Sequence, residues 1–381
     1  MESQVQVGLN EVGRNVNQDR RADIDAKHER IAKYLEEQGW EGLLLLEPAN
    51  VAWFTSGATS RGLCSAEELP AVFVTPSQRW LLASNADSQR LFDEELDEMG
   101  FLLKEWPWDW RRDYLLRSLA QAKRLACDRP WEDLPSAAGW LAERRRCLTP
   151  YEQACCRQLA EVVVHAVEAS CRNFQPRESE RELAGQVAHR LLRRGAWPVQ
   201  ISVSADGRSL QYRRHGFTAL PIENWCVVSA TAKKYGLHVT ASRTVCFGAA
   251  DQALRQAHNN ASKILAALTA ATWPDAIVRE VFLAARRIYT LVGAEHEWHA
   301  APIGYVTGRE PAETAIYPDS EAAMQVGWTL VWTPSVGPAL TGETITITSQ
   351  GPQLLTRVEA WPVIVVRVSG MEFQLPGILE R

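Results

Sequence analysis

The pattern of apolar residues changes once along the chain, within residues 133–150, and this change divides the sequence into two halves of different construction. In the first half, short apolar runs typical of buried strands occur at residues 42–47, 71–75, 79–83 and 124–128. Apolar residues at helical spacing occur at residues 25–38, 88–99 and 111–122, and Gly39 follows the first of these segments as a stop. Strands that alternate with helices predict an α/β domain with a largely parallel sheet.

The second half opens with two long helical patterns, at residues 150–173 and 178–194. Residues 197–247 are enriched in Val, Ile and Thr, as strands are. Two more helical patterns follow, near residues 250–272 and 275–292, and the rest of the chain returns to strand and turn. This order predicts an α+β domain. We therefore expect a mobile tail over residues 1–22, an N-terminal domain over 23–147 and a C-terminal domain over 148–381.

Composition excludes several classes of function. The net charge is −5 and the Lys and Arg residues are scattered, so the chain has no basic footprint for nucleic acid. No apolar run approaches the ~20 residues of a membrane span, and the polar N-terminus lacks the apolar core of a signal peptide. The 8 cysteines form no CxxC pair. They are typical of the free thiols of a cytoplasmic protein.

Several motifs stand in a recognisable order. Residues 30–39 (RIAKYLEEQG) and 42–57 (GLLLLEPANVAWFTSG) form a helix, a strand and a turn. In the second half, residues 148–152 (LTPYE), 242–248 (SRTVCFG) and 351–356 (GPQLLT) follow one another. Together they resemble the pita-bread family of aminopeptidase P, prolidase and creatinase over roughly residues 23–381. The resemblance implies a creatinase-like N-terminal α/β domain and a pita-bread C-terminal α+β domain.

Peptidases of this family bind two metal ions through two Asp, one His and two Glu. The resemblance places these ligands on Ser229, Thr240, Tyr305, Thr333 and Gly342, with Glu343 as an alternative for the last. A divalent pair needs several anionic oxygens, which hydroxyl groups and a glycine do not supply. We therefore expect no metal and no other cofactor.

Creatinase is a precedent for the same fold without metal. The resemblance places its catalytic histidine on His215, its carboxylate-binding arginine on Arg309 and a site tyrosine on His238. The glutamates that hold the guanidinium of its substrate fall on Ser242 and Thr333, so creatine is not the expected substrate. The family's homodimers close one subunit's site with the partner's N-terminal domain, a role that Trp53 and Arg61 would fill here.

Each of these residues also has an ordinary structural interpretation. His215 could be a surface histidine beside Arg213 and Arg214, whose charges would lower its pKa. Arg309 could pair with Glu310 or Glu313, and His238 could be a satisfied core histidine. The group of charges at residues 295–299 (EHEWH) is interpreted as solvated rather than as a metal site. Cys226 and Cys246 are interpreted as packed strand residues without catalytic reactivity.

The leading hypothesis is a metal-independent, creatinase-like enzyme that acts on a small carboxylated, amino-acid-derived substrate. His215 would be the acid/base catalyst, with His238 and Tyr305 as polar partners. Arg309, Ser229, Thr240, Ser242 and Thr333 would bind the substrate. Its reaction would be C–N hydrolysis, elimination or rearrangement. Two alternatives stay open: a non-catalytic pita-bread binding protein, and an Xaa-Pro-type metallopeptidase with rearranged ligands.

Overall fold

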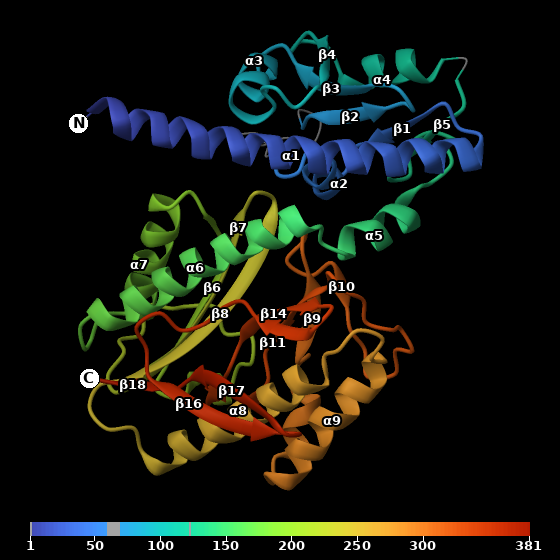
Figure 1. Cartoon of the computed structure of the whole chain (residues 1–381). Coiled ribbons are helices and arrows are strands. Elements are labelled where there is room, and N and C mark those ends of the chain that lie inside the picture. The colour runs from blue at the N-terminus through green and yellow to red at the C-terminus, as the bar shows by residue number, and fades with distance from the viewer. Residues whose placement is uncertain (1, 59–68, 122) are drawn as a thin grey trace. The chain divides into compact units, whose positions relative to one another are not determined.

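The computed structural model describes residues 2–58, 69–121 and 123–381, and of residues 2–16 the backbone alone. The chain divides into two compact units, residues 1–145 and 146–381. Figure 1 shows the elements of both units.

The N-terminal unit contains a mixed sheet. Its strands are β1 (Gly42–Leu45), β2 (Ala71–Val74), β3 (Arg79–Ser84), β4 (Leu102–Trp106) and β5 (Leu125–Cys127), in the order β4-β3-β2-β1-β5. β1 pairs parallel with β5 and β3 with β4, whereas β2 is antiparallel to both of its neighbours. The prediction of a largely parallel sheet is therefore wrong. The four residues 75–78 between β2 and β3 make a hairpin connection, and a parallel pair would need a longer crossover.

The helices of this unit are α1 (Glu2–Gln38), α2 (Pro48–Phe54), α3 (Ser88–Arg90), which continues as the π-helical turn η1 (Leu91–Glu95), α4 (Arg112–Ala120) and α5 (Ala138–Arg146). Helix α1 is helical from Glu2, and the mobile tail expected over residues 1–22 stays a prediction. Gly39, with φ of 68°, follows the end of α1 as predicted. The helices α2 and α5 and the strand β4 were not predicted.

The C-terminal unit contains two sheets. The first has the order β18-β8-β7-β6, from β6 (Trp197–Ala205), β7 (Trp225–Lys234), β8 (Leu237–Cys246) and β18 (Ile378–Glu380). The second has the order β10-β9-β11-β14-β15, from β9 (Gly304–Thr307), β10 (Thr314–Ala315), β11 (Thr329–Trp332), β14 (Glu343–Thr348) and β15 (Gly351–Leu354). Two hairpins accompany them, β12 (Ser335–Val336) with β13 (Ala339–Leu340), and β16 (Val363–Val368) with β17 (Met371–Pro376).

The helices of this unit are α6 (Pro150–Asn173), α7 (Glu180–Arg193), α8 (Gln252–Ala271) and α9 (Val278–Leu291), with the short 3₁₀ turns η2 (Arg208–Leu210) and η3 (Glu295–His299). The four long helices fall on the segments predicted to be helical. Capping boxes start α6 at Thr149 and α7 at Ser179, where each hydroxyl accepts a hydrogen bond from the backbone N–H three residues later.

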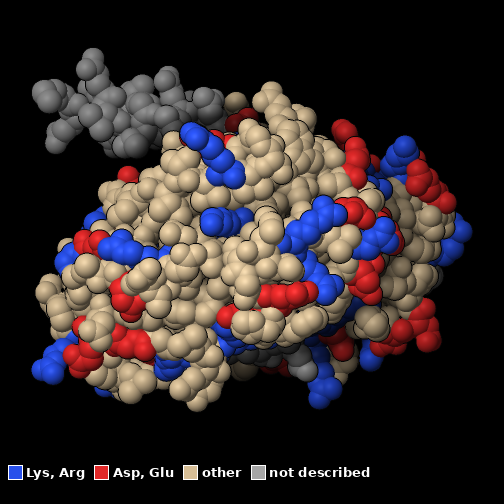
Figure 2. Space-filling model, turned by 90° about the horizontal axis from the view of Figure 1, so that it is seen from below, with Lys and Arg blue, Asp and Glu red and all other residues tan. Residues whose placement is uncertain are grey.

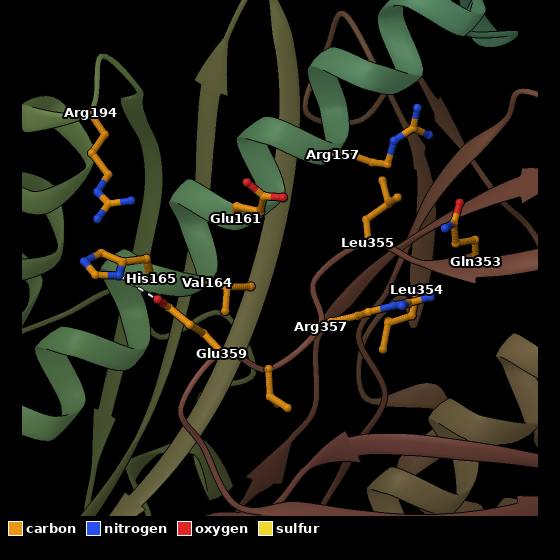
Figure 3. A pocket seen from close by; sticks show the side chains of 11 residues that line it. Arg157, Glu161, Val164, His165, Arg194, Gln353, Leu354, Leu355, Arg357 and Glu359 are labelled. Carbon is orange, nitrogen blue, oxygen red and sulfur yellow. Dashed lines mark hydrogen bonds and ion pairs between the residues drawn. The ribbon is translucent and has the colours of Figure 1, made fainter.

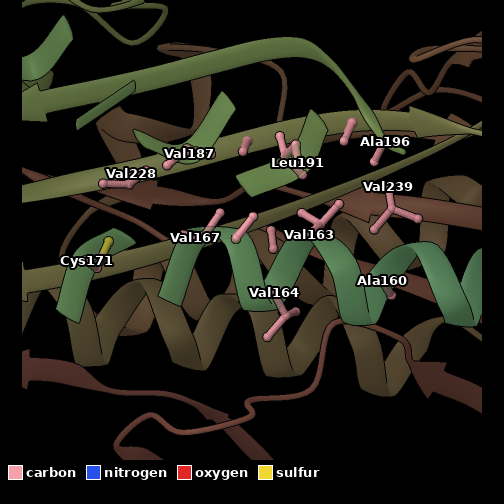
Figure 4. Packing of buried hydrophobic residues seen from close by; sticks show 14 of the residues in the cluster. Ala160, Val163, Val164, Val167, Cys171, Val187, Leu191, Ala196, Val228 and Val239 are labelled. Carbon is pink, nitrogen blue, oxygen red and sulfur yellow. The ribbon is translucent and has the colours of Figure 1, made fainter. Parts of the chain in front are cut away.

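One face of the first sheet is buried by α6 and α7 (Figure 1). Side chains at alternate strand positions, among them Val228 and Val239, pack on Val163 and Val167 of α6 and Leu191 of α7 (Figure 4). A second apolar cluster joins α8 and α9 to β9, β11 and β14. Because strand side chains alternate between faces, the residues between the buried ones on β6, β7 and β8 point to the opposite face. The candidate site lies on that face.

The surface is mixed in charge. On the face shown in Figure 2, basic and acidic side chains are interspersed rather than gathered by sign. Within residues 2–58, 69–121 and 123–381, no helix is both long enough and apolar enough to cross a bilayer.

Candidate functional site

Two rows of polar residues cross the first sheet on the face away from α6 and α7. Ser202, Ser229 and Ser242 lie opposite one another on β6, β7 and β8, and so do Gln200, Thr231 and Thr240. The two rows are two residues apart on each strand, so their side chains share one face. The sheet therefore presents a surface of hydroxyl and amide groups.

Hydrogen bonds connect these hydroxyl groups across the strands. The Oγ1 atoms of Thr231 and Thr240 are 2.7 Å apart, and the hydroxyl of Ser242 donates to that of Ser229 at 2.9 Å. From β9, the phenol of Tyr305 also bonds with Thr240 and Thr231. Burial raises the pKa of Tyr305 and these hydrogen bonds oppose the rise, so the phenol is neutral near pH 7.

A pocket of about 360 Å³ covers this surface. We call it the polar pocket. It brings together five of the residues predicted for the site, which are His215, Ser229, Thr240, Tyr305 and Thr333. Its other lining residues are Gln200, Ser202, Arg213, Arg214, Thr231, Ala301, Pro302, Pro311, Ala312, Ser335 and Leu340.

His215 is held in one tautomer by the loop that carries it. Its Nδ1 lies 3.2 Å from the carbonyl oxygen of Tyr212, so the proton resides on Nδ1 and donates to that oxygen. Its Nε2 is buried and has no hydrogen-bond partner among the described residues. Arg208 fixes the loop by donating to the His215 carbonyl oxygen, at 3.0 Å, and by pairing with Glu180.

The pKa of His215 is lowered, as the sequence predicted, but for a different reason. Burial is the largest cause, and the nearby positive charge that contributes belongs to Arg208 rather than to Arg213 or Arg214. The imidazole is therefore neutral at pH 7. Its Nε2 lone pair is not used in a hydrogen bond among the described residues, so it is available to accept a proton.

The two arginines before His215 differ in their partners. Arg213 forms an ion pair with Glu297 and donates to the carbonyl oxygen of Gly337. Glu297 also accepts from the backbone N–H of Gly337 at 2.7 Å, so it is buried and paired rather than solvated as predicted. Arg214 is exposed and has no side-chain partner in the part of the chain that the structure describes. It is the free cation of the polar pocket among the described residues.

His238 does not line the polar pocket. It is buried, and its Nδ1 donates to the carbonyl oxygen of Gly308 at 3.0 Å. Burial, together with the charges of Lys233 and Arg309, lowers its pKa to about 4. This is the satisfied core histidine of the structural interpretation, and its geometry does not favour a catalytic role.

Arg309 also lies outside the polar pocket. The residue is 2% exposed, and its guanidinium forms a buried ion pair with Glu152 and donates to the carbonyl oxygen of Tyr235. The expected exposed pairing with Glu310 or Glu313 is therefore replaced by a buried pairing with α6. This geometry does not favour Arg309 as the substrate's carboxylate anchor.

Trp53 and Arg61 are the two residues of the N-terminal domain that were expected to contribute to a site. Trp53 is 1% exposed and packs in the core of its own unit, where Lys27 donates to its carbonyl oxygen at 2.8 Å. Arg61 lies outside the described residues. Burial raises the pKa of Cys246 to about 12 and that of Cys226 well above its usual value, as expected for unreactive packed thiols.

The comparisons with known proteins identify the family. The sequence model of metallopeptidase family M24 matches residues 154–355. The chain belongs to metallopeptidase family M24. It is thus homologous to the M24 peptidases, and no curated protein matches it.

Solved structures share the fold of this M24 chain. The prolidase from Pyrococcus horikoshii OT3 matches 88% of this chain and 99% of its own, at 16% identity and a TM-score of 0.75. The X-Pro aminopeptidase from Thermotoga maritima MSB8 matches 87% of this chain and 98% of its own, at 15% identity and a TM-score of 0.74. The N-terminal domain of the FACT complex subunit SPT16 from Cicer arietinum (chickpea) matches 91% and 97%, at 11% identity and a TM-score of 0.66. The fold is the pita-bread fold of this family.

The M24 family implies a pair of metal ions, and the residues here do not fit one. The resemblance places the ligands on residues that line the polar pocket with neutral hydroxyl groups, namely Ser229, Thr240, Tyr305 and Thr333. Hydroxyl groups do not supply the anionic oxygens that a divalent pair requires. Across the described residues, no group of three or more His, Cys, Asp and Glu side chains is arranged to hold a metal ion.

The remaining ligand position is closed by packing. A Cβ atom at Gly342 would lie 2.4 Å from the Oγ of Ser242, so a side chain there would displace Ser242. Glu343 is 1% exposed, accepts from Nη1 of Arg243 at 2.7 Å and bonds with Thr356. Glu343 does not line the polar pocket, so it does not supply the carboxylate that the family has at the last ligand position.

Another hollow, of about 520 Å³, lies along the outer side of α6 (Figure 3). Arg157 and Arg357 lie toward one end of it and Arg194 toward the other, so their guanidinium groups do not converge. His165 there is paired with Glu359 through a 2.9 Å contact. This hollow lacks the convergent polar groups of the polar pocket.

Sequence reasoning missed several residues of the polar pocket. Gln200, Ser202 and Thr231 carried a usable signal, because polar residues alternate with apolar ones along β6 and β7. Arg214 was noted only as a neighbour of His215. Ser242 was predicted, but it is not among the lining residues; it lies opposite Ser229 on β8 and donates to the hydroxyl of Ser229.

Proposed function

We propose that this chain is a metal-independent, creatinase-like member of family M24 that acts on a small carboxylated, amino-acid-derived compound. The observation that carries the proposal is the state of His215. Its Nδ1 donates a hydrogen bond to the carbonyl oxygen of Tyr212. Its buried Nε2 has no hydrogen-bond partner among the described residues. The side chain is one of those that line the polar pocket. A neutral imidazole in this state is suited to general base catalysis.

The charge of the polar pocket favours an anionic ligand. Its lining residues include Arg213 and Arg214, and no Asp or Glu is among those that the structure describes. Arg214 takes the role first assigned to Arg309, because its fork of donors has no ion-pair partner among the described residues and suits a carboxylate. The hydroxyl groups of Ser229, Thr240 and Tyr305 hydrogen-bond the rest of the substrate.

Hydrolysis of a C–N bond is the first reaction to test. In this reaction Nε2 of His215 takes a proton from the attacking water, and the resulting imidazolium returns a proton to the leaving nitrogen. The Tyr305 phenol, neutral because burial raises its pKa, donates to the oxyanion that develops on the carbonyl oxygen. Elimination or rearrangement would use the same proton transfers at His215.

The proposal extends to location and assembly. The described cysteines, Cys127, Cys147, Cys155, Cys156, Cys171, Cys226 and Cys246, are free thiols. Free thiols are typical of a reducing compartment, so we place the protein in the cytoplasm. We also propose a homodimer, by analogy with the creatinase-like proteins that the sequence resembles.

The test is amide hydrolysis by protein dialysed against a chelator, with metal content measured by mass spectrometry. N-acetylglycine and N-acetylphenylalanine serve as substrates, and released amine is the readout. We expect activity without metal, reduced about a hundredfold or more by His215→Asn. His189→Asn, an exposed histidine on α7, is the matched control and keeps wild-type activity.

Two outcomes would overturn the proposal. Activity that depends on near-stoichiometric metal would establish the metallopeptidase with rearranged ligands. Ligand binding without turnover, unaffected by His215→Asn, would establish the non-catalytic binding protein.

A further inference from the structure

The polar pocket has an apolar neighbour, which is a different hollow from the one beside α6. Its volume is about 550 Å³. We call it the apolar annex. The side chains that form most of its wall are Phe282, Trp298, Ile303, Ile316, Tyr317 and Pro318.

The apolar annex and the polar pocket share part of their lining. Residues of both are Arg214, Ala301, Pro302, Tyr305 and Ala312. Arg214 and Tyr305 are the polar members of this shared set. A molecule with its anionic group at Arg214 therefore has hydroxyl groups on one side and apolar side chains on the other.

The wall of the apolar annex is held by aromatic packing. The Trp298 ring meets Phe282 edge to face at a centroid distance of 5.6 Å, and Tyr289 at 5.8 Å. Phe282 also packs on Trp332 at 5.9 Å. Phe282, Ile303 and Ile316 are all buried in this wall. The annex is thus a preformed surface, and filling it costs little ordering of side chains.

The described linings of the apolar annex and the polar pocket both contain basic side chains and no carboxylate. Among the lining residues of the annex that the structure describes, the ionisable groups are Arg214, His299 and the phenols of Tyr305 and Tyr317, and none is a carboxylate. A positively charged substrate group finds no carboxylate among the described residues of either lining. A carboxylate beside an uncharged apolar group matches both.

We propose that the apolar annex receives an aromatic or branched aliphatic group of the substrate while Arg214 holds its carboxylate. This inference rests on the proposed function of the polar pocket and names its substrate class, the N-acyl derivatives of bulky apolar amino acids. Burial of a large apolar side chain in such a site is worth about tenfold or more in affinity.

The test compares two N-acyl amino acids that differ in this group. The dissociation constants of N-acetylglycine and N-acetylphenylalanine are measured by isothermal titration calorimetry on full-length protein. We expect N-acetylphenylalanine to bind at least tenfold more tightly. Ala315→Trp, whose position lines the annex but not the polar pocket, reduces this ratio to about one. Ala322→Trp, an exposed alanine outside both linings, keeps the wild-type ratio.

A second filling variant covers the case in which Ala315→Trp does not fold. Ala300 is exposed and lines only the apolar annex, so Ala300→Trp is expected to give the same loss of preference. Circular dichroism and the melting temperature establish that each variant is folded before its ratio is compared.

The outcomes separate this inference from the proposed function. Equal affinity of both compounds for the wild type overturns the annex and leaves the polar pocket standing, provided that Arg214→Gln weakens both. If both tryptophan variants still bind N-acetylphenylalanine more tightly than N-acetylglycine, the assignment of the apolar group to the annex is also overturned. Binding that Arg214→Gln leaves unchanged, or the absence of any binding, overturns the proposed function together with the annex.

Discussion

The guanidinium of Arg309 pairs with the carboxylate of Glu152, although the two residues are 157 positions apart in the chain. Both side chains are almost fully buried. Glu152 also accepts the backbone N–H of Thr149 at 2.9 Å, so the same carboxylate closes the capping box of α6. Arg309 therefore ties the loop after β9 to the first turn of a core helix.

Replacement of Arg309 by Met is expected to lower the free energy of unfolding by about 3–5 kcal/mol, because Glu152 would keep a buried charge without its partner. Urea denaturation measures the change. Arg214→Met is the control, and as an exposed substitution it is expected to change stability by about 0.5 kcal/mol or less. Wild-type stability in Arg309→Met, with ligand binding lost, would return the anchor role to Arg309.

His238 makes stability depend on pH. Its pKa is lowered to about 4 in the folded protein, by burial first and then by Lys233 and Arg309. Between pH 6.5 and about 4 the unfolded chain therefore holds a proton that the folded chain does not, so stability falls as pH falls through this window. His238 accounts for about 3 kcal/mol of this loss.

His238→Gln is expected to flatten the decline of the melting temperature between pH 6.5 and 4. The slope does not vanish, because burial also lowers the pKa of His215 and His258. His189→Gln on the exposed side of α7 keeps the wild-type slope. An unchanged slope in His238→Gln would mean that this imidazole is protonated in the folded protein.

Because Gly342 lies close to Ser242, substitutions at these two positions are expected to affect stability in a non-additive way. In Gly342→Ala the new methyl group meets the Ser242 hydroxyl at 2.4 Å, and such overpacking costs about 1–3 kcal/mol. Adding Ser242→Ala leaves the nearest neighbours at 3.3 and 3.4 Å, which neighbouring atoms accommodate with small shifts. A double-mutant cycle in urea is expected to show a favourable coupling of about 1 kcal/mol or more. Additive effects would show that the segment before β14 that carries Gly342 moves aside.

Local patterns predicted the elements that position the site. Helix α6 was located from its periodicity and from Pro150 at its start, and the family positions identified five residues of the polar pocket. The sequence could not show that Arg309 meets Glu152, because a buried ion pair between distant residues leaves no local pattern. The antiparallel direction of β2 was missed because the apolar run of a buried strand carries no sign of its direction.

The donor set of the polar pocket predicts weak affinity for divalent metal. Cobalt(II) titrated into the wild type is expected to produce no visible d–d absorption bands at micromolar concentration, because the hydroxyl groups of Ser229, Thr240 and Thr333 are neutral. The double variant Ser229→Asp/Thr240→Asp places two carboxylates on adjacent strands of the same face and is expected to bind cobalt at least about tenfold more tightly. Binding is followed by absorbance and calorimetry after removal of resident metal with a chelator. Stoichiometric micromolar binding by the wild type would contradict the metal-independent mechanism and direct attention to rearranged ligands.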